Sequence, residues 1–209
     1  DEIVEPNQKP DDTKIRNSNG LQLLSQTKGL NVVVNYCGIV KDTPAEIEKV
    51  IAKSLNTCDV LILTGGVSMG DYDFVPDALL KNNIDIVFKE IAVKPGKPTV
   101  FGRRGNQFVF GLPGNPVSSF VIFELIVKPF VYKMMGHQYT RPFIKMPFGI
   151  DYKRRNAERT QWLPVFINDI GEVMPVEYHG SGHLHSVCYA DGFVAVDEGV
   201  FTISKNQEV

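Results

Sequence analysis

The sequence predicts an α/β domain with a largely parallel sheet, followed by a smaller all-β domain. Up to about residue 136, apolar runs typical of buried strands alternate with helical segments. From residue 142 onward the chain has short alternating apolar segments, several glycines and no helical period, as in a small barrel or sandwich. This change of texture predicts domains over residues 1–138 and 139–209.

The first expected elements follow in order. A polar loop over residues 6–17 precedes a helix that Ser18 can cap and Gly29 can end. Residues 32–40 are expected to form a strand. Thr43 begins the next helix, because it can cap, a proline occupies the first helical position and a glutamate completes a capping box.

The later elements of this domain are marked by continuous apolar runs and glycine-rich breaks. The run at residues 60–63 is typical of a strand buried on both faces. The remaining expected elements are a short helix over residues 74–81, strands over residues 84–93, 99–102 and 107–111, and a long helix from residue 117 to about residue 136.

Composition narrows the class of protein. A net charge of −2 over 209 residues gives no basic field for nucleic acid or an anionic membrane. Three widely spaced cysteines and no CxxC favour reduced thiols, so a cytoplasmic location is expected. The apolar stretch over residues 117–135 contains charged residues and a proline, which favours a buried helix. Because the chain begins with Asp1, it is expected to be a piece of a longer protein.

Two of the predicted strands end in glycine-rich polar loops. In open α/β sheets, ligands bind outside the carboxyl ends of the strands. Bare backbone N–H groups beside a helix N-terminus can bind an anion, although glycines also serve plain strand-to-helix turns. Neither loop has the Walker or dinucleotide spacing. The candidate residues are Gly65, Gly66, Ser68 and Gly70 in the first loop, and Pro113, Gly114, Asn115 and Pro116 in the second.

Charged residues flank these loops. Asp71 and Asp73 either complement a helix dipole or, with phosphate oxygens, bind Mg²⁺. Asp42 follows an expected strand and faces the same side of the sheet, or simply forms a turn. Lys94 and Lys97 lie on a rigid Pro-Gly-Pro loop, which favours anion binding over a solvated hairpin.

Together these motifs resemble the molybdopterin molybdotransferases, the MoeA and gephyrin E-domain family. The matching segments are LTGGVSMGDYDF (63–74), AVKPGKP (92–98) and GLPGNPVSSF (111–120). Weaker matches are Asp1-Glu2, Asn17-Ser18-Asn19, and residues 180–184 and 190–192. The resemblance implies a MogA-like three-layer domain without its first strand, followed by the C-terminal β-barrel of the family.

The resemblance also implies a reaction. Members of the family insert molybdate into adenylylated molybdopterin and hydrolyse the adenylate with a divalent metal such as Mg²⁺. It implies a homodimer, contact with the molybdopterin adenylyltransferase, and an inactive fragment when other domains are missing. The resemblance implies that Glu2, Asp42 and Asp73 are the acidic residues of the site, with Asp42 and Asp73 as metal ligands. It implies that Lys94 and Lys97 bind the anion and that Arg159 and Ser181 close the site from the β domain. The implied contacts to the pterin or nucleotide are Asn19, Asp71 and Pro113–Pro116.

One departure leaves an alternative open. The family often has a second lysine four residues before Lys94, where this chain has Glu90 and a neighbouring Lys89. Either a local bulge recruits Lys89, or the site has one cation fewer. Two other functions also remain open: a MogA-type adenylyltransferase, which shares the two glycine loops, and a non-enzymatic scaffold or dimerising module.

Overall fold

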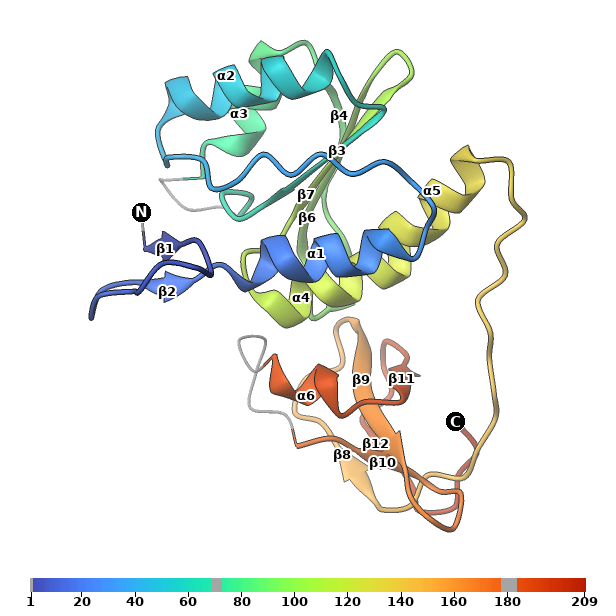
Figure 1. Cartoon of the computed structure of the whole chain (residues 1–209). Helices are drawn as coiled ribbons and strands as arrows, with labels where there is room; N and C mark the ends of the chain where they lie inside the picture. Colours follow the sequence, from blue (N-terminus) through green and yellow to red (C-terminus); the bar gives the residue numbers. More distant parts are fainter. Residues whose placement is uncertain (1, 69–72, 178–183) are drawn as a thin grey trace.

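The computed structural model describes residues 2–68, 73–177 and 184–209, with only the backbone of His185 and Ser186. The chain forms an α/β domain and a smaller β domain, joined by an extended linker (Figure 1). This arrangement confirms the expected fold class. Within the described residues, no helix is long and apolar enough to span a bilayer.

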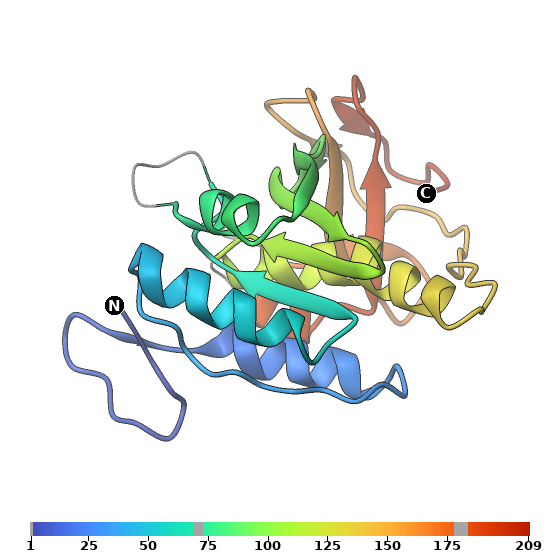
Figure 2. The same cartoon turned by 90° about the horizontal axis from the view of Figure 1, so that it is seen from above.

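A four-stranded sheet lies at the centre of the α/β domain. Its strands run in the order β3 (Val60–Thr64), β7 (Gln107–Leu112), β6 (Pro98–Arg104) and β4 (Asp85–Glu90). Helices α2 (Pro44–Leu55) and α3 (Val75–Lys81) cover one face. The other face is covered by α1 (Ser18–Lys28) and by a long helix, which makes three layers (Figures 1 and 2).

Apolar side chains fill both gaps between these layers. On α2, Ile47, Ile51 and Leu55 repeat at four-residue spacing, so they share the face that packs on the sheet. On the opposite side, Phe110 of β7 packs among residues of α1 and the long helix and is 1% exposed. The sheet is therefore covered on both faces.

The expectation of a mostly parallel sheet was wrong for these four strands. Only β3 and β7 pair in parallel; β7 with β6 and β6 with β4 are antiparallel. The physical reason is the connection: only Gly105 and Asn106 separate β6 from β7. A two-residue turn permits an antiparallel hairpin, whereas a parallel pair needs a long crossover.

The strand expected over residues 32–40 is also absent from the described structure. This segment runs extended on the β3 side of the sheet, outside any ladder (Figure 2). Val33 is 93% exposed, while Tyr36 and Ile39 are 46% and 39% exposed. Most of these side chains are exposed, so the segment lacks the burial that the strands of the covered sheet have. Near the N-terminus, β1 (Ile3–Val4) lies before the expected loop and pairs in parallel with β2 (Ile15–Arg16), which lies inside it.

The long helix expected from residue 117 is present and carries a π-helical turn. It consists of α4 (Pro116–Ile122), the π segment η1 (Phe123–Val127) and α5 (Lys128–Met134). The N–H of Lys128 donates to the carbonyl of Phe123, five residues earlier. Pro129 follows immediately, and its ring disturbs the regular ladder.

The β domain has its own apolar core. Strand β9 (Thr160–Ile167) pairs with β10 (Val173–Pro175) on one side and β11 (Gly192–Val196) on the other, while β8 (Tyr152–Lys153) pairs with β12 (Thr202–Ile203). A four-residue helix, α6 (His185–Cys188), is an addition to the expected all-β texture. From the other domain, β5 (Val93–Lys94) pairs in parallel with the start of β9.

We expect Phe110→Ala to lower the free energy of unfolding by about 3–5 kcal/mol, because it removes a fully buried ring and leaves a cavity. Urea denaturation measures this change. The control is Val87→Ala on β4, where the side chain is 55% exposed and a change within about 0.5 kcal/mol is expected. Equal losses for the two variants would contradict the core assignment.

Candidate functional site

Strand register brings three of the sequence-predicted loops to one edge of the sheet. In the β3–β7 pair Thr64 lies opposite Leu112, and in the β6–β7 pair Val100 lies opposite Gly111. The loop after β3, the loop after β7 and the loop before β6 therefore begin side by side. Neighbouring strands lie about 4.8 Å apart, so the three loops start within about 10 Å of one another.

Direct contacts join the two glycine loops. The N–H of Gly65 donates to the carbonyl of Leu112 at 3.0 Å. A methyl group added to Gly114 would lie 3.5 Å from the Cα of Gly65. Gly65 and Gly66 have φ values of +83° and +64°, which other residues rarely adopt. Backbone conformation therefore favours glycine at positions 65 and 66, the distance at Gly114 is an ordinary van der Waals contact, and Ser68 is exposed just beyond the two glycines.

The N-terminus of α1 belongs to the same cluster. The amide of Asn19 donates to the carbonyl of Gly114 at 2.7 Å. The helix is capped by Asn17, whose side-chain oxygen accepts from the N–H of Gly20 at 3.0 Å; the expected cap, Ser18, is already the first helical residue. At the start of α4, Asn115 occupies the cap position without a side-chain capping bond, and Pro116 takes the first turn.

The Lys94–Pro98 loop packs against the end of α4. Gly96 has φ of +118°, and an added Cβ would collide with the side chain of Ile122. The hydroxyl of Thr99 donates to the carbonyl of Gly96 at 2.7 Å, which ties the turn together. Lys94 and Lys97 remain exposed on this fixed backbone. Their backbone is ordered before any ligand arrives, so less conformational entropy is lost on binding.

The structure shows which neighbour Glu90 has at the lysine loop. The register shifts between Phe88 and Glu90, as a bulge requires, but Glu90 is the residue that reaches the loop. Its carboxylate lies 3.2 Å from the ammonium of Lys97, with the two side chains 43% and 52% exposed. Here the lysine loop therefore carries a carboxylate neighbour in place of a further cation.

The β domain contributes Arg159 to the same loop. Its guanidinium donates to the carbonyl of Val93 at 3.2 Å, and Val93 pairs with Thr160 in the β5–β9 ladder. Lys94 lies opposite Gln161 in that ladder. Arg159 and Lys94 therefore approach the same end of the loop from different domains.

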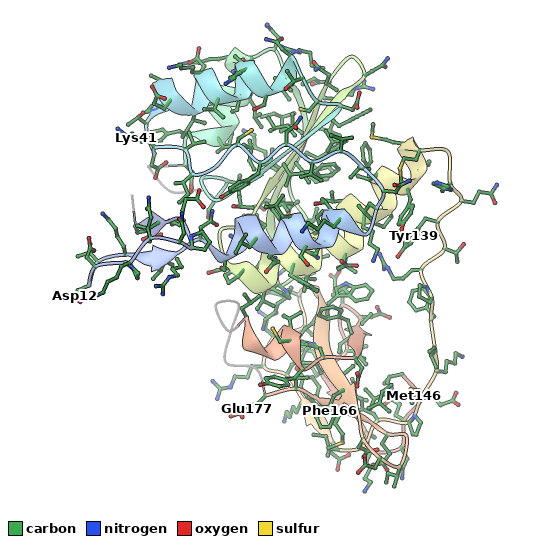
Figure 3. All side chains as sticks on the ribbon, viewed as in Figure 1. Asp12, Lys41, Tyr139, Met146, Phe166 and Glu177 are labelled. Atoms are coloured by element: carbon green, nitrogen blue, oxygen red, sulfur yellow. The ribbon has the colours of Figure 1, made fainter. Side chains whose placement is uncertain are left out.

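The acidic residues predicted for the site lie on different segments of the chain. Asp42 is exposed directly before α2, beside Lys41 at the edge of the molecule that also carries β1 (Figure 3). Glu2 is exposed before β1, and Asp73 is partly buried before α3. Among the described residues, no three His, Cys, Asp or Glu side chains come together as a metal-ion group. Gly70, Asp71 and Ser181 lie outside the described residues.

A polar cluster beside α1 escaped the sequence analysis. The hydroxyl of Tyr36 lies 2.9 and 3.0 Å from the two carboxylate oxygens of Glu5 and accepts from the amide of Asn17 at 2.9 Å. Burial, and secondarily the Glu5 carboxylate, raises the pKa of Tyr36 to about 12. The N–H of Ile39 also donates to Glu5, at 3.2 Å. No local motif signals this cluster, because 31 residues separate Glu5 from Tyr36.

Comparisons with known proteins agree with this geometry. Residues 1–133 match the family described as "Probable molybdopterin binding domain". The chain belongs to this molybdopterin-binding domain family. Residues 150–209 match a second family, the MoeA C-terminal region (domain IV). The molybdopterin-binding match begins and ends on the α/β domain, so the three converging loops lie within it. The expected boundary near residue 138 falls between the two matches and stays a prediction.

Curated proteins similar to this chain include molybdopterin molybdenumtransferases. Molybdopterin molybdenumtransferases from Staphylococcus epidermidis and Staphylococcus aureus are 30% and 31% identical over 201 residues, covering 95% of this chain and 48% of theirs. The molybdopterin biosynthesis MoeA protein of Pyrococcus horikoshii has a similar structure, with a TM-score of 0.85, 28% identity, and coverage of all of this chain and 50% of that one. The chain thus spans about half the length of these relatives.

We expect Glu90→Gln to strengthen binding of a molybdate dianion by about two- to fivefold at low salt, the range for removing one exposed ion pair. Lys97 then loses its competing carboxylate and is free for the anion. Isothermal titration with sodium molybdate measures the change. A matched control is Glu48→Gln, which breaks an ion pair of the same 3.2 Å length with Lys81 on the opposite helical layer. Equal affinity in wild type and Glu90→Gln would contradict competition at Lys97.

We also expect Tyr36 to ionise about two pH units above a free tyrosine, whose pKa is near 10. Because the folded-state pKa is raised, its contribution to stability is complete below pH 10 and is lost as the pH rises towards 12. The absorbance titration at 295 nm of wild type minus Tyr36→Phe isolates this group. Glu5→Gln should move the step back towards 10, whereas a difference titration centred at 10 in wild type would refute the contact.

Proposed function

We propose that this chain forms the ligand-binding half of a molybdopterin molybdotransferase, which inserts molybdate into adenylylated molybdopterin as part of a longer protein. The observation that carries the proposal is the convergence of the glycine loops and the lysine loop at one sheet edge. The matches of both halves of the chain, and the names of the staphylococcal relatives, support the same reaction.

The geometry fits an extended anionic ligand. An added Cβ at Gly65 would meet nothing within 4 Å, so the backbone there leaves room for phosphate oxygens beside it, while the Gly65 N–H itself is bonded to Leu112. Asn19 holds the second loop by donating to the carbonyl of Gly114. The side chain of Asn115, at the start of α4, makes no capping bond and is available for a polar heterocycle. Lys94 and Arg159 add positive charge at the far end of the ligand.

These positions assign a role to each cation. Molybdate is a dianion, so it needs fixed positive charge beside the dithiolene that receives it. Lys94 and Lys97 hold the oxyanion, with Glu90 weakening the hold of Lys97. Arg159 presents further donors from the β domain, since within the described residues its guanidinium makes one hydrogen bond, to Val93.

Hydrolysis of the adenylate requires water to add to phosphorus while adenosine monophosphate leaves. In the proposal Glu2, Asp42 and Asp73 are the acidic residues of this step. A bound Mg²⁺ would supply Lewis-acid chemistry at the phosphate, with Asp42 and Asp73 as ligands. Since no three candidate ligands gather among the described residues, substrate oxygens would have to complete such a site. Gly70, Asp71 and Ser181 complete the proposed set.

The remaining expectations belong to the whole protein. We propose a homodimer that works in the cytoplasm and receives its substrate from the molybdopterin adenylyltransferase. A small-molecule substrate, without nucleic acid or membrane, agrees with the near-neutral charge. The adenylyltransferase and scaffold alternatives are less favoured, because the β5–β9 ladder builds the lysine loop into a second domain that matches the MoeA C-terminal region.

The experiment that tests this proposal uses the full natural protein containing this chain. We expect Lys94→Ala to slow molybdate insertion at least tenfold and to raise the molybdate concentration needed for half-maximal rate, because a site cation is lost. Conversion of adenylylated molybdopterin to molybdenum cofactor is followed by chromatography of the pterin products. Lys28→Ala, at the far end of α1, is the control. Unchanged insertion by Lys94→Ala would remove the lysine loop from the site.

A further inference from the structure

The two faces of the β9–β11 ladder meet different parts of the molecule. Leu163 and Val165 point into the core of the β domain. Side chains alternate along a strand, so Trp162 and Pro164 point the other way. In the ladder Pro164 lies opposite Phe193, whose ring is 6.3 Å from that of Phe120 on α4. The second face therefore packs on the long helix, between the two domains (Figure 1).

The helix offers an acceptor at this place. In a regular α-helix the N–H of residue 129 would donate to the carbonyl of Leu125, but Pro129 has no N–H. The π segment ends here as well. The guanidinium of Arg141, from the linker, donates to the Leu125 carbonyl at 2.9 Å. A side chain thus replaces a backbone donor that proline removed.

The same guanidinium reaches the β domain. Its central carbon lies 5.2 Å from the centre of the Trp162 ring, within the range of a cation–π interaction. A planar guanidinium can stack on a ring while its edge donates hydrogen bonds, which an ammonium group cannot do equally well. Arg141 therefore contacts the long helix and the β domain at once.

The linker is attached at few points. Tyr139 stacks on Tyr132 of α5, with ring centres 4.9 Å apart (Figure 3). Directly after Arg141 the linker becomes exposed to solvent, and Phe143 and Ile144 are each 76% exposed. Arg141 is thus the final contact before the exposed stretch, at the point where the linker passes the junction between the domains.

We propose that Arg141 is a positioning residue that locks the β domain onto the π-helical turn. Strand β9 begins directly after Arg159, so a lock at Trp162 also fixes the strand end that presents Arg159 to Val93. The β5–β9 ladder also holds that strand end, and Phe193 packs near Phe120 at the same junction. Without Arg141 the β domain would depend on these remaining contacts, and Arg159 would be held less firmly beside Lys94.

The chain provides its own probe, since Trp162 is its only tryptophan. We expect Arg141→Met to shift tryptophan emission to longer wavelength and to raise the acrylamide quenching constant about twofold, because the ring loses its covering cation. Arg141→Lys should lie between Arg141→Met and wild type. Arg155→Met, at an exposed arginine of the β domain, is the matched control. Chymotrypsin cleavage after Phe143 should be several-fold faster in Arg141→Met than in wild type and unchanged in Arg155→Met.

Circular dichroism and urea denaturation show whether Arg141→Met folds. If it does not fold, the cleavage experiment is done with Arg141→Lys and Trp162→Phe instead. Unchanged quenching and unchanged cleavage in a folded Arg141→Met protein would overturn the lock. A further measurement rests on the proposed function: molybdate affinity should fall in Arg141→Met and recover partly in Arg141→Lys. Wild type that binds no molybdate would refute the proposed function, while fluorescence and cleavage would still decide the role of Arg141.

Discussion

The candidate site depends on the register of β7 with its two neighbours. This strand runs parallel to β3 and antiparallel to β6, so the ends of β3 and β7 coincide with the beginning of β6. A slip of one residue would shift a loop by about 3.3 Å and turn its strand's side chains to the other face. The contacts of Gly65 with Leu112 and of Asn19 with Gly114 follow from this alignment.

The β domain is joined to the candidate site through the β5–β9 ladder. The β5–β9 pair carries the lysine loop into the sheet of the β domain, and Arg159 donates back to Val93. Lys97 pairs with Glu90 at 3.2 Å, so one positive charge of the lysine loop is offset by a neighbouring carboxylate.

Local sequence signals were sufficient for most elements. The apolar spacing on α2, the Pro116 start and the apolar run of β3 predicted those elements within a residue or two. The meeting of the polar loops was predicted, but other long-range relations were not. The prediction of a parallel sheet failed because a two-residue turn dictates the β6–β7 direction, and residues 32–40 are mostly exposed and stay outside any ladder. The link between Glu5 and Tyr36 spans 31 residues and has no local signature.

By itself, the sequence determined the family, the α/β-then-β order, and the identity of the polar loops, because these depend on residue types at short spacing. Only the tertiary structure decided which residues face one another: Glu90 and not Lys89 beside Lys97, Asn17 and not Ser18 at the helix cap, Arg141 between Leu125 and Trp162. Strand pairing and domain packing bring together residues far apart in the chain, and no local pattern encodes the distances that result.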